Sequence, residues 1–350
     1  MCVEKKNDYR IEADSIGTKD VPEDVYYGVQ SLRAAENFHI TGLNMHPEII
    51  NSLAYIKKAC AITNCEVGLL DKKIANAIVQ ACDEIIAGKF HDDFIVDPIQ
   101  GGAGTSLNMN ANEVIANRAI EILGGEKGDY DIVHPNDHVN YGQSTNDVIP
   151  TAGKITSLRL LKNLKSELRR LHDTLVKKAE EFDHVIKMGR TQMQDAVPIR
   201  LGQEFRAYSV AIMRDIHRMD IAMSEMHTVN MGGTAVGTGI NADETYLKRI
   251  VPNLSEVADM ELVQAFDLID STQNLDSFVA VSGAVKACAV TLSKIANDLR
   301  LMSSGPRAGF GEINLPARQN GSSIMPGKVN PVIPEVVNQV AFNIIGNDVT

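Results

Sequence analysis

Long stripes of apolar residues, spaced by threes and fours, dominate the second half of this 350-residue chain. Three such stripes run through charged surroundings, over residues 161–182, 201–226 and 278–302. Each extends over about three heptads, which is longer than the average globular helix of about three turns. Because no caps divide these segments, the pattern predicts a long helical bundle with coiled-coil-like packing.

The first part of the chain follows a different pattern. Helical periodicity is shorter there, over about residues 47–67 and 71–88, and turn residues punctuate the opening segment. Few stretches alternate with period two. We therefore expect an all-α fold, with a smaller, mainly helical N-terminal lobe over residues 1–145 and a central long-helix bundle over residues 146–350.

The last segment begins a further helix at Pro334, with apolar residues on one face. The sequence stops a few turns later without a clear cap. This pattern predicts that the chain is a shortened form of a longer polypeptide, with an incomplete bundle.

Charge and composition exclude several classes. The formal net charge of -11 argues against nucleic-acid binding, so an anionic substrate needs a local positive site. Five cysteines without CxxC spacing favour reduced, mostly buried thiols and a cytoplasmic location. The N-terminus, which includes Cys2, lacks the apolar region of a secretory signal. The sequence has no run of 18 apolar residues, so it predicts no membrane span.

Polar islands rich in Gly, Ser, Thr and Asn lie between the helical patterns. They occupy residues 101–110, 134–147, 189–198, 232–241 and 321–331. Hydroxyls, amides and helix N-termini suit a carboxylate anion. For any single residue, a turn or an N-cap is the better interpretation, and Ser144 or Asn146 could cap the next helix. Five similar islands at helix ends nevertheless favour an anion site, because a bundle brings helix ends together.

Other motif interpretations are weaker. The GGTAVGTG segment lacks a GK[ST] ending and an expected preceding strand, which argues against nucleotide binding. His134 and His138 are separated by Pro135 and lack HExxH, so a hydrogen-bonded structural role is favoured over metal binding. Ser322 lacks the GxSxG elbow of a hydrolase.

GSSIMPGKVNP, residues 321–331, is similar to the signature loop of the aspartase/fumarase superfamily, whose members eliminate across a C–N or C–O bond to release fumarate. RIEADSIG, GGAGTSLNMN, HPNDHVN, QSTND, GRTQMQDAVP and GGTAVGTG resemble that family in the same order. The resemblance runs from about residue 10 to the last residue. It implies a homotetramer in which three subunits share each active site, and a small C-terminal helical domain that this chain lacks.

Within the superfamily, three features favour the aspartase branch over class II fumarases. They are the residues after KVNP, Thr145 in place of a second serine, and Gln192 after Thr191. Tyr141 and Gly142 depart from the commoner residues before QSTN. Fumarate hydration remains the alternative activity, and cleavage of adenylosuccinate or argininosuccinate fits less well. A structural bundle protein, as in lens crystallins derived from a related lyase, is disfavoured because Ser322 and Lys328 are both present.

The resemblance implies a role for each polar residue of the islands. Ser322 would be the catalytic base, and Lys328 would support its alkoxide. Donors to the β-carboxylate of L-aspartate would be Thr105, Ser144, Thr145 and Ser323. The α-carboxylate would be held by Thr191, Lys328 and Asn330, and the amino group by Asn146 and Gln192.

The implied chemistry is proton abstraction from C3 of a small dicarboxylate, L-aspartate, to give fumarate through an aci-carboxylate. Preorganised donors would stabilise that intermediate by several kcal/mol, on the order expected for such sites. No cofactor is required, because proton transfer and electrostatics suffice. A divalent cation could modulate activity, but no ligand set in the sequence identifies one. Glycines at 321 and 327 would let the loop close and open.

Overall fold

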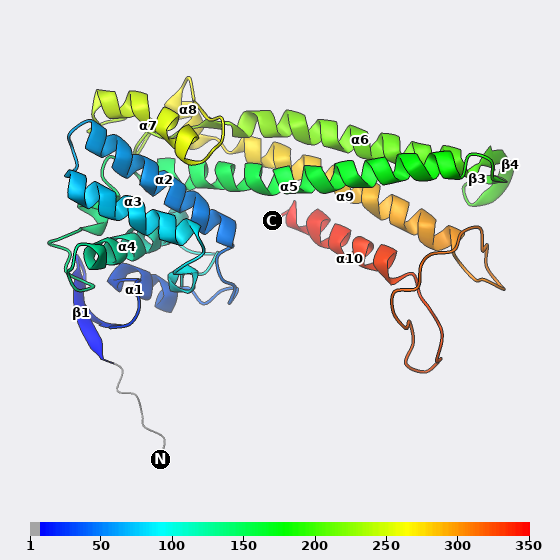
Figure 1. Cartoon of the computed structure of the whole chain (residues 1–350), viewed down its shortest axis with the longest axis horizontal. Coiled ribbons are helices and arrows are strands. Elements are labelled where there is room, and N and C mark those ends of the chain that lie inside the picture. Colours follow the sequence, from blue (N-terminus) through cyan, green and yellow to red (C-terminus); the bar gives the residue numbers. More distant parts are fainter. Residues whose placement is uncertain (1–7) are drawn as a thin grey trace, which may run out of the picture. The chain divides into compact units, whose positions relative to one another are not determined.

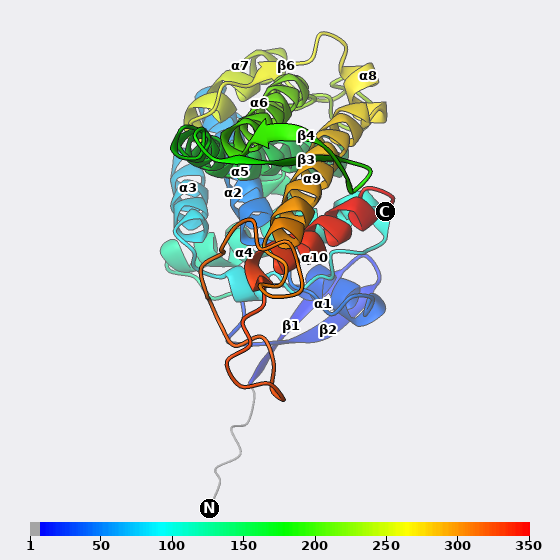
Figure 2. The same cartoon turned by 90° about the vertical axis from the view of Figure 1, so that its right-hand side faces the viewer.

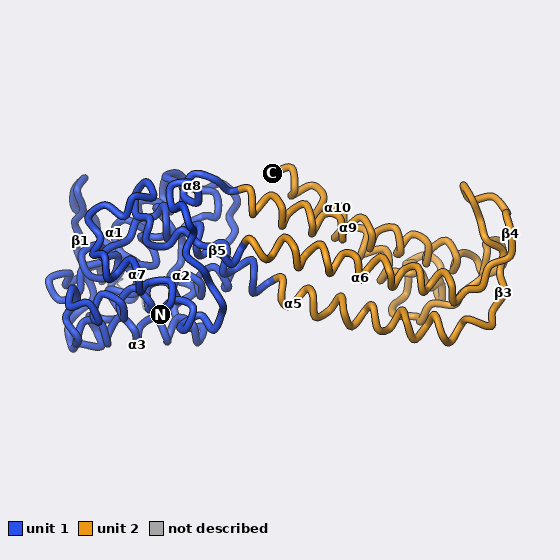
Figure 3. Tube along the Cα trace, turned by 90° about the horizontal axis from the view of Figure 1, so that it is seen from above, with its two compact units in different colours: residues 1–160, 226–275 blue, residues 161–225, 276–350 orange. Residues whose placement is uncertain are grey.

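The structure is a computed structural model that describes residues 8–350 and divides into two compact units (Figures 1 and 3). Unit 1 comprises the described residues up to 160 together with 226–275, and unit 2 comprises residues 161–225 and 276–350. The boundary expected at residue 145 differs from this division. The first turns of the 37-residue helix α5 (Thr145–Glu181) belong to unit 1, and the chain returns to this unit at residue 226.

The helices predicted from periodicity are confirmed. They are α2 (Pro47–Glu66), α3 (Lys72–Ile86), α5, α6 (Leu201–Met226) and α9 (Asp276–Met302). The all-α class is also confirmed, because the strands form only short two-stranded sheets within residues 8–350. Cys2 lies outside the described residues.

Unit 1 opens with the antiparallel hairpin of β1 (Tyr9–Asp14) and β2 (Gly17–Pro22). Helix α2 packs against α3 and α7 (Glu244–Val257), and α3 packs against α4 (Thr105–Ile122). Fully buried side chains such as Leu53, Ile56, Ile78 and Ile115 fill this core. The remaining elements are α1 (Val29–Asn37), α8 (Leu268–Gln273) and the single turns η1 (His91–Asp93), η2 (Gly102–Gly104) and η3 (Pro135–Val139).

A short strand precedes the glycine-rich segment of residues 232–241, contrary to the sequence expectation. Strand β5 (Thr228–Val229) pairs in parallel with β6 (Val263–Gln264). Sequence periodicity could not reveal it, because two residues are too few to show alternation.

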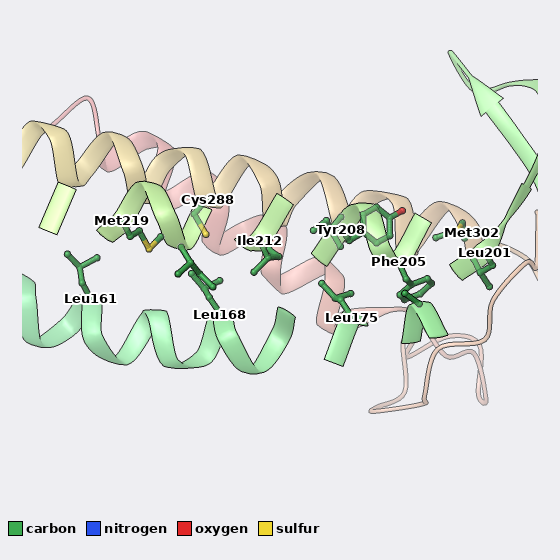
Figure 4. Close-up of a cluster of buried hydrophobic side chains, with 13 residues drawn as sticks. Leu161, Leu168, Leu175, Leu201, Phe205, Tyr208, Ile212, Met219, Cys288 and Met302 are labelled. Atoms are coloured by element: carbon green, nitrogen blue, oxygen red, sulfur yellow. The ribbon is translucent and has the colours of Figure 1, made fainter. Parts of the chain in front are cut away.

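Unit 2 is built on three helices whose core positions recur every seven residues (Figure 4). The series are Leu161, Leu168 and Leu175 on α5, Phe205, Ile212 and Met219 on α6, and Cys288, Ile295 and Met302 on α9. A seven-residue repeat is the pattern of coiled-coil packing, as the sequence predicted. Helix α10 (Val332–Asn347) packs along α9.

One end of unit 2 carries its irregular segments. The hairpin of β3 (Ile186–Thr191) and β4 (Gln194–Arg200) joins α5 to α6, and residues 303–331 join α9 to α10. Figure 2 looks onto this end, with the hairpin and the 303–331 segment both towards the viewer.

Helix α9 also meets the length and composition of a membrane span, with a mean hydropathy of 1.5 over its most apolar window. It is the one helix among the described residues that does so. An apolar core helix of a bundle passes the same test, so this finding does not assign α9 to a membrane.

Candidate active site

The predicted site residues fall into two groups, one in each unit. Unit 1 holds Thr105, Ser144, Thr145 and Asn146, and unit 2 holds Thr191, Gln192, Ser322, Ser323, Lys328 and Asn330.

Thr105 is the first residue of α4, directly after a glycine turn. Gly104 has a φ of +90°, which favours glycine, and an added β-carbon would lie 2.9 Å from Ile149 Cγ1 on α5. The start of α4 therefore packs closely against the second turn of α5. The Thr105 hydroxyl donates to Gly102 O at 2.6 Å, and the residue is exposed.

Ser144 caps the N-terminus of α5, as one of the sequence interpretations held. Its Oγ accepts from Asn146 N at 3.2 Å, and its own N–H donates to Asp147 Oδ1 at 2.8 Å. This reciprocal arrangement resembles a capping box and fixes the first turn of the helix. Asn146 serves another purpose, because its Nδ2 donates to Ala235 O at 2.7 Å.

Asp147 attaches the glycine-rich segment after β5 to the same turn. Its Oδ2 accepts from Gly232 N at 3.3 Å and from Thr234 N at 3.0 Å. Burial raises the pKa of this carboxyl to about 6, although the N–H groups of Ser144, Thr234 and Gly232 act to lower it. Asp147 is fully buried, so it organises the turn without facing a ligand.

The unit 1 group thus places hydroxyls at the N-termini of two helices that pack together. Helix N-termini present unpaired N–H groups and positive partial charge, which favour a carboxylate. Thr105 begins α4 and Thr145 begins α5, and Asn108 Nδ2 donates to Thr145 Oγ1 at 3.4 Å across the two helices. The starts of α4 and α5, which carry Thr105 and Thr145, are therefore in contact through Asn108 and Gly104.

Thr191 and Gln192 lie at the tip of the β3–β4 hairpin. Thr191 pairs with Gln194, so Gln192 and Met193 form a two-residue turn, with φ values of 52° and 64°. Two positive φ angles are typical of a type I′ hairpin turn, which normally selects Asn and Gly. Gln192 therefore occupies a strained position for its residue type, and such strain is concentrated at functional sites.

The signature loop is closed on itself at its two ends. Gly321 N donates to Lys328 O at 2.8 Å, and Asn330 Nδ2 donates to Gly321 O at 2.8 Å. A β-carbon on Gly321 would lie 2.5 Å from Asn330 Cγ, so only glycine fits there. Between these ends, Ser322 Oγ accepts from Met325 N at 3.1 Å, while Ser323 and Lys328 are exposed.

A pocket of about 690 Å³ joins the hairpin to the signature loop within unit 2. Its wall includes Met193, Lys328 and Asn330, together with Arg300 and Ser304 from the end of α9 and the segment after it. The residue next to Gln192 and two predicted α-carboxylate ligands thus border one space. Lys328 and Arg300 are the cations of this wall, and Asp298 is its one carboxylate.

The structural prediction for His134 and His138 is confirmed. His134 Nδ1 accepts from the backbone N–H groups of Asn136 and Asp137, and His138 Nδ1 accepts from His134 N at 2.8 Å. Both rings therefore cap a turn. Within residues 8–350, no group of three or more His, Cys, Asp or Glu side chains has the arrangement of a metal site.

Sequence reasoning missed several residues around the site. Arg190 pairs with Glu312 beneath the hairpin tip, and Lys57 binds amide side chains beneath the α5 turn. Arg190 lies in the polar island of residues 189–198, but nothing in the sequence marks its distant partner. Lys57 looked like any charged residue in a helical pattern.

Comparisons with known proteins show the family of this chain. A family model described as a lyase matches residues 17–346, so the chain belongs to this lyase family. The predicted membership of the aspartase/fumarase superfamily is confirmed by this match and by the similar proteins described next.

Among the similar proteins, the aspartate ammonia-lyase of Bacillus subtilis (strain 168) is 59% identical over 345 residues, which cover 99% of this chain and 73% of that protein. A fumarate lyase (delta crystallin) from Brucella melitensis, solved with cobalt bound, is 51% identical with a TM-score of 0.94, covering 97% of this chain and 75% of that one. A class II fumarase from Schistosoma mansoni is 36% identical with a TM-score of 0.93, and the match covers 98% of this chain and 75% of that one.

Proposed function

We propose that this protein is an aspartate ammonia-lyase, which converts L-aspartate reversibly into fumarate and ammonia. The observation that carries the proposal is the 59% identity over 345 residues with an aspartate ammonia-lyase. Identity to a class II fumarase of the same fold is only 36%. The difference favours ammonia over water as the leaving group.

The central chemical problem is removal of a proton from C3, because the carbanion forms next to a carboxylate that already carries charge. Donors must be aimed at the oxygens of the resulting aci-carboxylate. We assign this task to Thr105, Ser144, Thr145 and Ser323, of which Thr105 must exchange its hydrogen bond to Gly102 O for one to the substrate. Support comes from Thr105 and Thr145, which begin two helices packed against each other.

Ser322 is the proposed base. A free serine hydroxyl is too weak an acid to ionise at neutral pH, so its surroundings must favour the alkoxide. Its Oγ already accepts an N–H from Met325, and a hydrogen bond of this kind stabilises the charged form. Lys328, on the same loop, would add positive charge.

The remaining predicted residues would hold the α-amino and α-carboxylate groups. Lys328 and Asn330 border the pocket beside the hairpin tip, where Thr191 and Gln192 lie. One N–H of the Asn330 amide is used by Gly321 O, which orients the side chain. The Asn146 amide donates to Ala235 O, and this bond leaves its carbonyl oxygen to accept from an ammonium.

We further propose a cytoplasmic homotetramer that needs no cofactor and binds neither nucleic acid nor membrane. Large apolar side chains remain exposed on the long helices of unit 2, which supports burial against further subunits. Examples are Val210, Ile221, Val279, Val340 and Phe342, with exposed fractions between 54% for Val210 and 70% for Val279. Their proposed burial also accounts for the apolar character of α9.

The proposal is tested by comparing L-aspartate and L-malate as substrates. We expect L-aspartate to yield equal amounts of ammonia and fumarate, and L-malate to yield little or no fumarate. Fumarate is followed by its ultraviolet absorbance and ammonia by a coupled assay. Faster release of fumarate from L-malate than from L-aspartate would assign the protein to the fumarases instead.

A further inference from the structure

Lys57 is a fully buried cation directly beneath the turn that begins α5. It lies on α2, has no exposed surface, and its ammonium contacts three amide oxygens at 2.8 Å each. These oxygens belong to Asn108, Asn140 and Gln143. An ammonium has three protons, so these neutral acceptors satisfy it completely.

Such a cation is costly, because burial of an ammonium without a directly paired anion forfeits its hydration. A hydrophobic residue would fill the same volume at lower cost, so packing alone does not account for a lysine here. The three amide contacts instead act on the neighbouring turn.

The ammonium fixes which way each amide points. Because Lys57 takes the Asn108 oxygen, the Asn108 Nδ2 group must face elsewhere, and it donates to Thr145 Oγ1 at 3.4 Å and to Asn140 Oδ1 at 3.2 Å. Asn140 Nδ2 in turn donates to Gln143 O at 3.1 Å. The donor direction therefore runs outward from Lys57 towards the turn.

At the end of this chain, Thr145 Oγ1 accepts a hydrogen bond and keeps its own proton. A hydroxyl that accepts from one side presents its O–H to the other side. Among the contacts of the described residues, this hydroxyl proton has no protein acceptor. It is left as a donor at the N-terminus of α5, where an anion is favoured.

We propose that Lys57 is a positioning residue for the elimination reaction. Its ammonium orients Asn108 so that the Thr145 hydroxyl donates to the developing aci-carboxylate, and it places a positive charge behind that donor. The inference rests on the proposed function and deepens it, because it assigns part of the stabilisation of the intermediate to a residue that does not touch substrate.

The charge state of Lys57 should make the activity pH-dependent. Burial lowers the pKa of its ammonium to about 8. The titratable groups near it are Cys60, Asp147 and Cys82, of which Asp147 is the anion at neutral pH, because burial raises the pKa of both thiols. The cation is therefore present below about pH 8 and lost above it. Above this pH, Lys57 no longer orients the Asn108 amide as a cation.

The main test replaces Lys57 by Met, which keeps the length and removes the ammonium. The matched control is Lys58→Met, which removes an ammonium from the next position of the same helix, where it pairs with Asp83 near the surface. We expect Lys57→Met to lower kcat by about 100-fold, the effect of one lost donor to a developing oxyanion. The fall of kcat/KM near pH 8 should disappear in Lys57→Met and persist in Lys58→Met. Equal kinetics and equal pH profiles of the two variants would overturn the proposal.

A second pair of variants keeps the test decisive if Lys57→Met does not fold. Asn108→Leu and Thr145→Val are close in shape to the residues they replace, and the double variant completes a cycle. Action of Asn108 through Thr145 predicts that the double variant is no slower than the worse single variant. If the loss of kcat in the double variant equals the product of the two single losses, the residues act independently and the proposal is overturned.

Failure of the proposed function has a separate signature. If the unchanged protein releases no ammonia from L-aspartate, the function fails whatever Lys57 does. Calorimetric binding of succinate then still tests the donor chain, because an oriented Thr145 should bind a carboxylate. Weaker binding by Asn108→Leu than by the unchanged protein supports the chain of donors, and equal binding overturns it.

Discussion

Arg190 and Glu312 form a two-pronged ion pair between the β3–β4 hairpin and the segment that follows α9. Arg190 Nη1 donates to Glu312 Oε2 at 3.1 Å and Nη2 donates to Oε1, while the Phe310 ring lies 4.0 Å from the guanidinium. Glu312 is itself anchored to the end of α9, since its N–H donates to Met302 O at 2.8 Å. The pair therefore holds the hairpin, which carries Thr191 and Gln192 at its tip, against the segment that follows α9.

Replacement of Glu312 by Gln should destabilise unit 2 by about 1–3 kcal/mol, between the values for exposed and buried pairs. The side chains of Arg190 and Glu312 are only 16% and 15% exposed. The control is Asp183→Asn, which breaks the exposed Asp183–Arg200 pair of the same unit and should cost less than about 0.5 kcal/mol. Chemical denaturation measures both, and equal losses would show that the ion pairs of Glu312, with Arg190 and with Lys187 at 3.1 Å, contribute no more than the exposed pair.

The same pair predicts a pH dependence. The hydrogen bond from Arg190 lowers the pKa of Glu312 below its usual value of 4.5. The stabilisation is therefore complete above pH 4.5 and is lost as pH falls through the lower pKa of the folded state. Between these pH values, the difference in unfolding free energy between the unchanged protein and Glu312→Gln should shrink. A constant difference would exclude this titration as its source.

Ser322→Ala should lower kcat by about 10²–10⁴-fold, the range for loss of a positioned base. Binding of fumarate should remain, because the variant removes few binding contacts. Ser323→Ala is the neighbouring control, and it should lose a carboxylate donor while keeping proton abstraction. Exchange of the C3 proton of L-aspartate with deuterated solvent distinguishes them. Near-normal exchange in Ser322→Ala would mean that another group is the base.

Lys328→Ala should both raise KM and lower kcat, because the lysine would pair with the α-carboxylate and support the Ser322 alkoxide. Steady-state kinetics with L-aspartate measures the two effects. A solvated loop lysine would leave both parameters unchanged, and that result would remove Lys328 from the site.

Asp147→Asn should cost about 1–3 kcal/mol of stability, because an amide replaces one oxygen that accepts buried N–H groups. Asp137→Asn is the control, since the Asp137 side chain is 79% exposed. Burial raises the pKa of Asp147 from 3.8 to about 6, so the folded state binds the extra proton between these values. Its contribution to the unfolding free energy should therefore fall as pH rises from 3.8 to about 6, and Asp147→Asn should lack this slope. An unchanged slope in the variant would contradict the assignment.

The sequence by itself determined the long helices and the chemical character of the islands. Seven-residue series such as Phe205, Ile212 and Met219 lie on one helix, so their meaning is local and can be read from spacing. The signature loop could also be recognised from the sequence, because GSSIMPGKVNP carries its glycines, serines and lysine within a single run. Such runs identified the superfamily and supplied the candidate residues of the site.

Only the tertiary structure decided how those residues are supported. Lys57 meets Gln143 from 86 positions away, Asp147 holds Thr234, and Arg190 meets Glu312 across 122 positions. The return of residues 226–275 to unit 1 is of the same kind. Spacing along a chain records which face of a helix a residue occupies, but not what packs against that face. Partners across long separations are set by how the helices pack, and that packing fixes the direction of each amide and the charge beneath each turn.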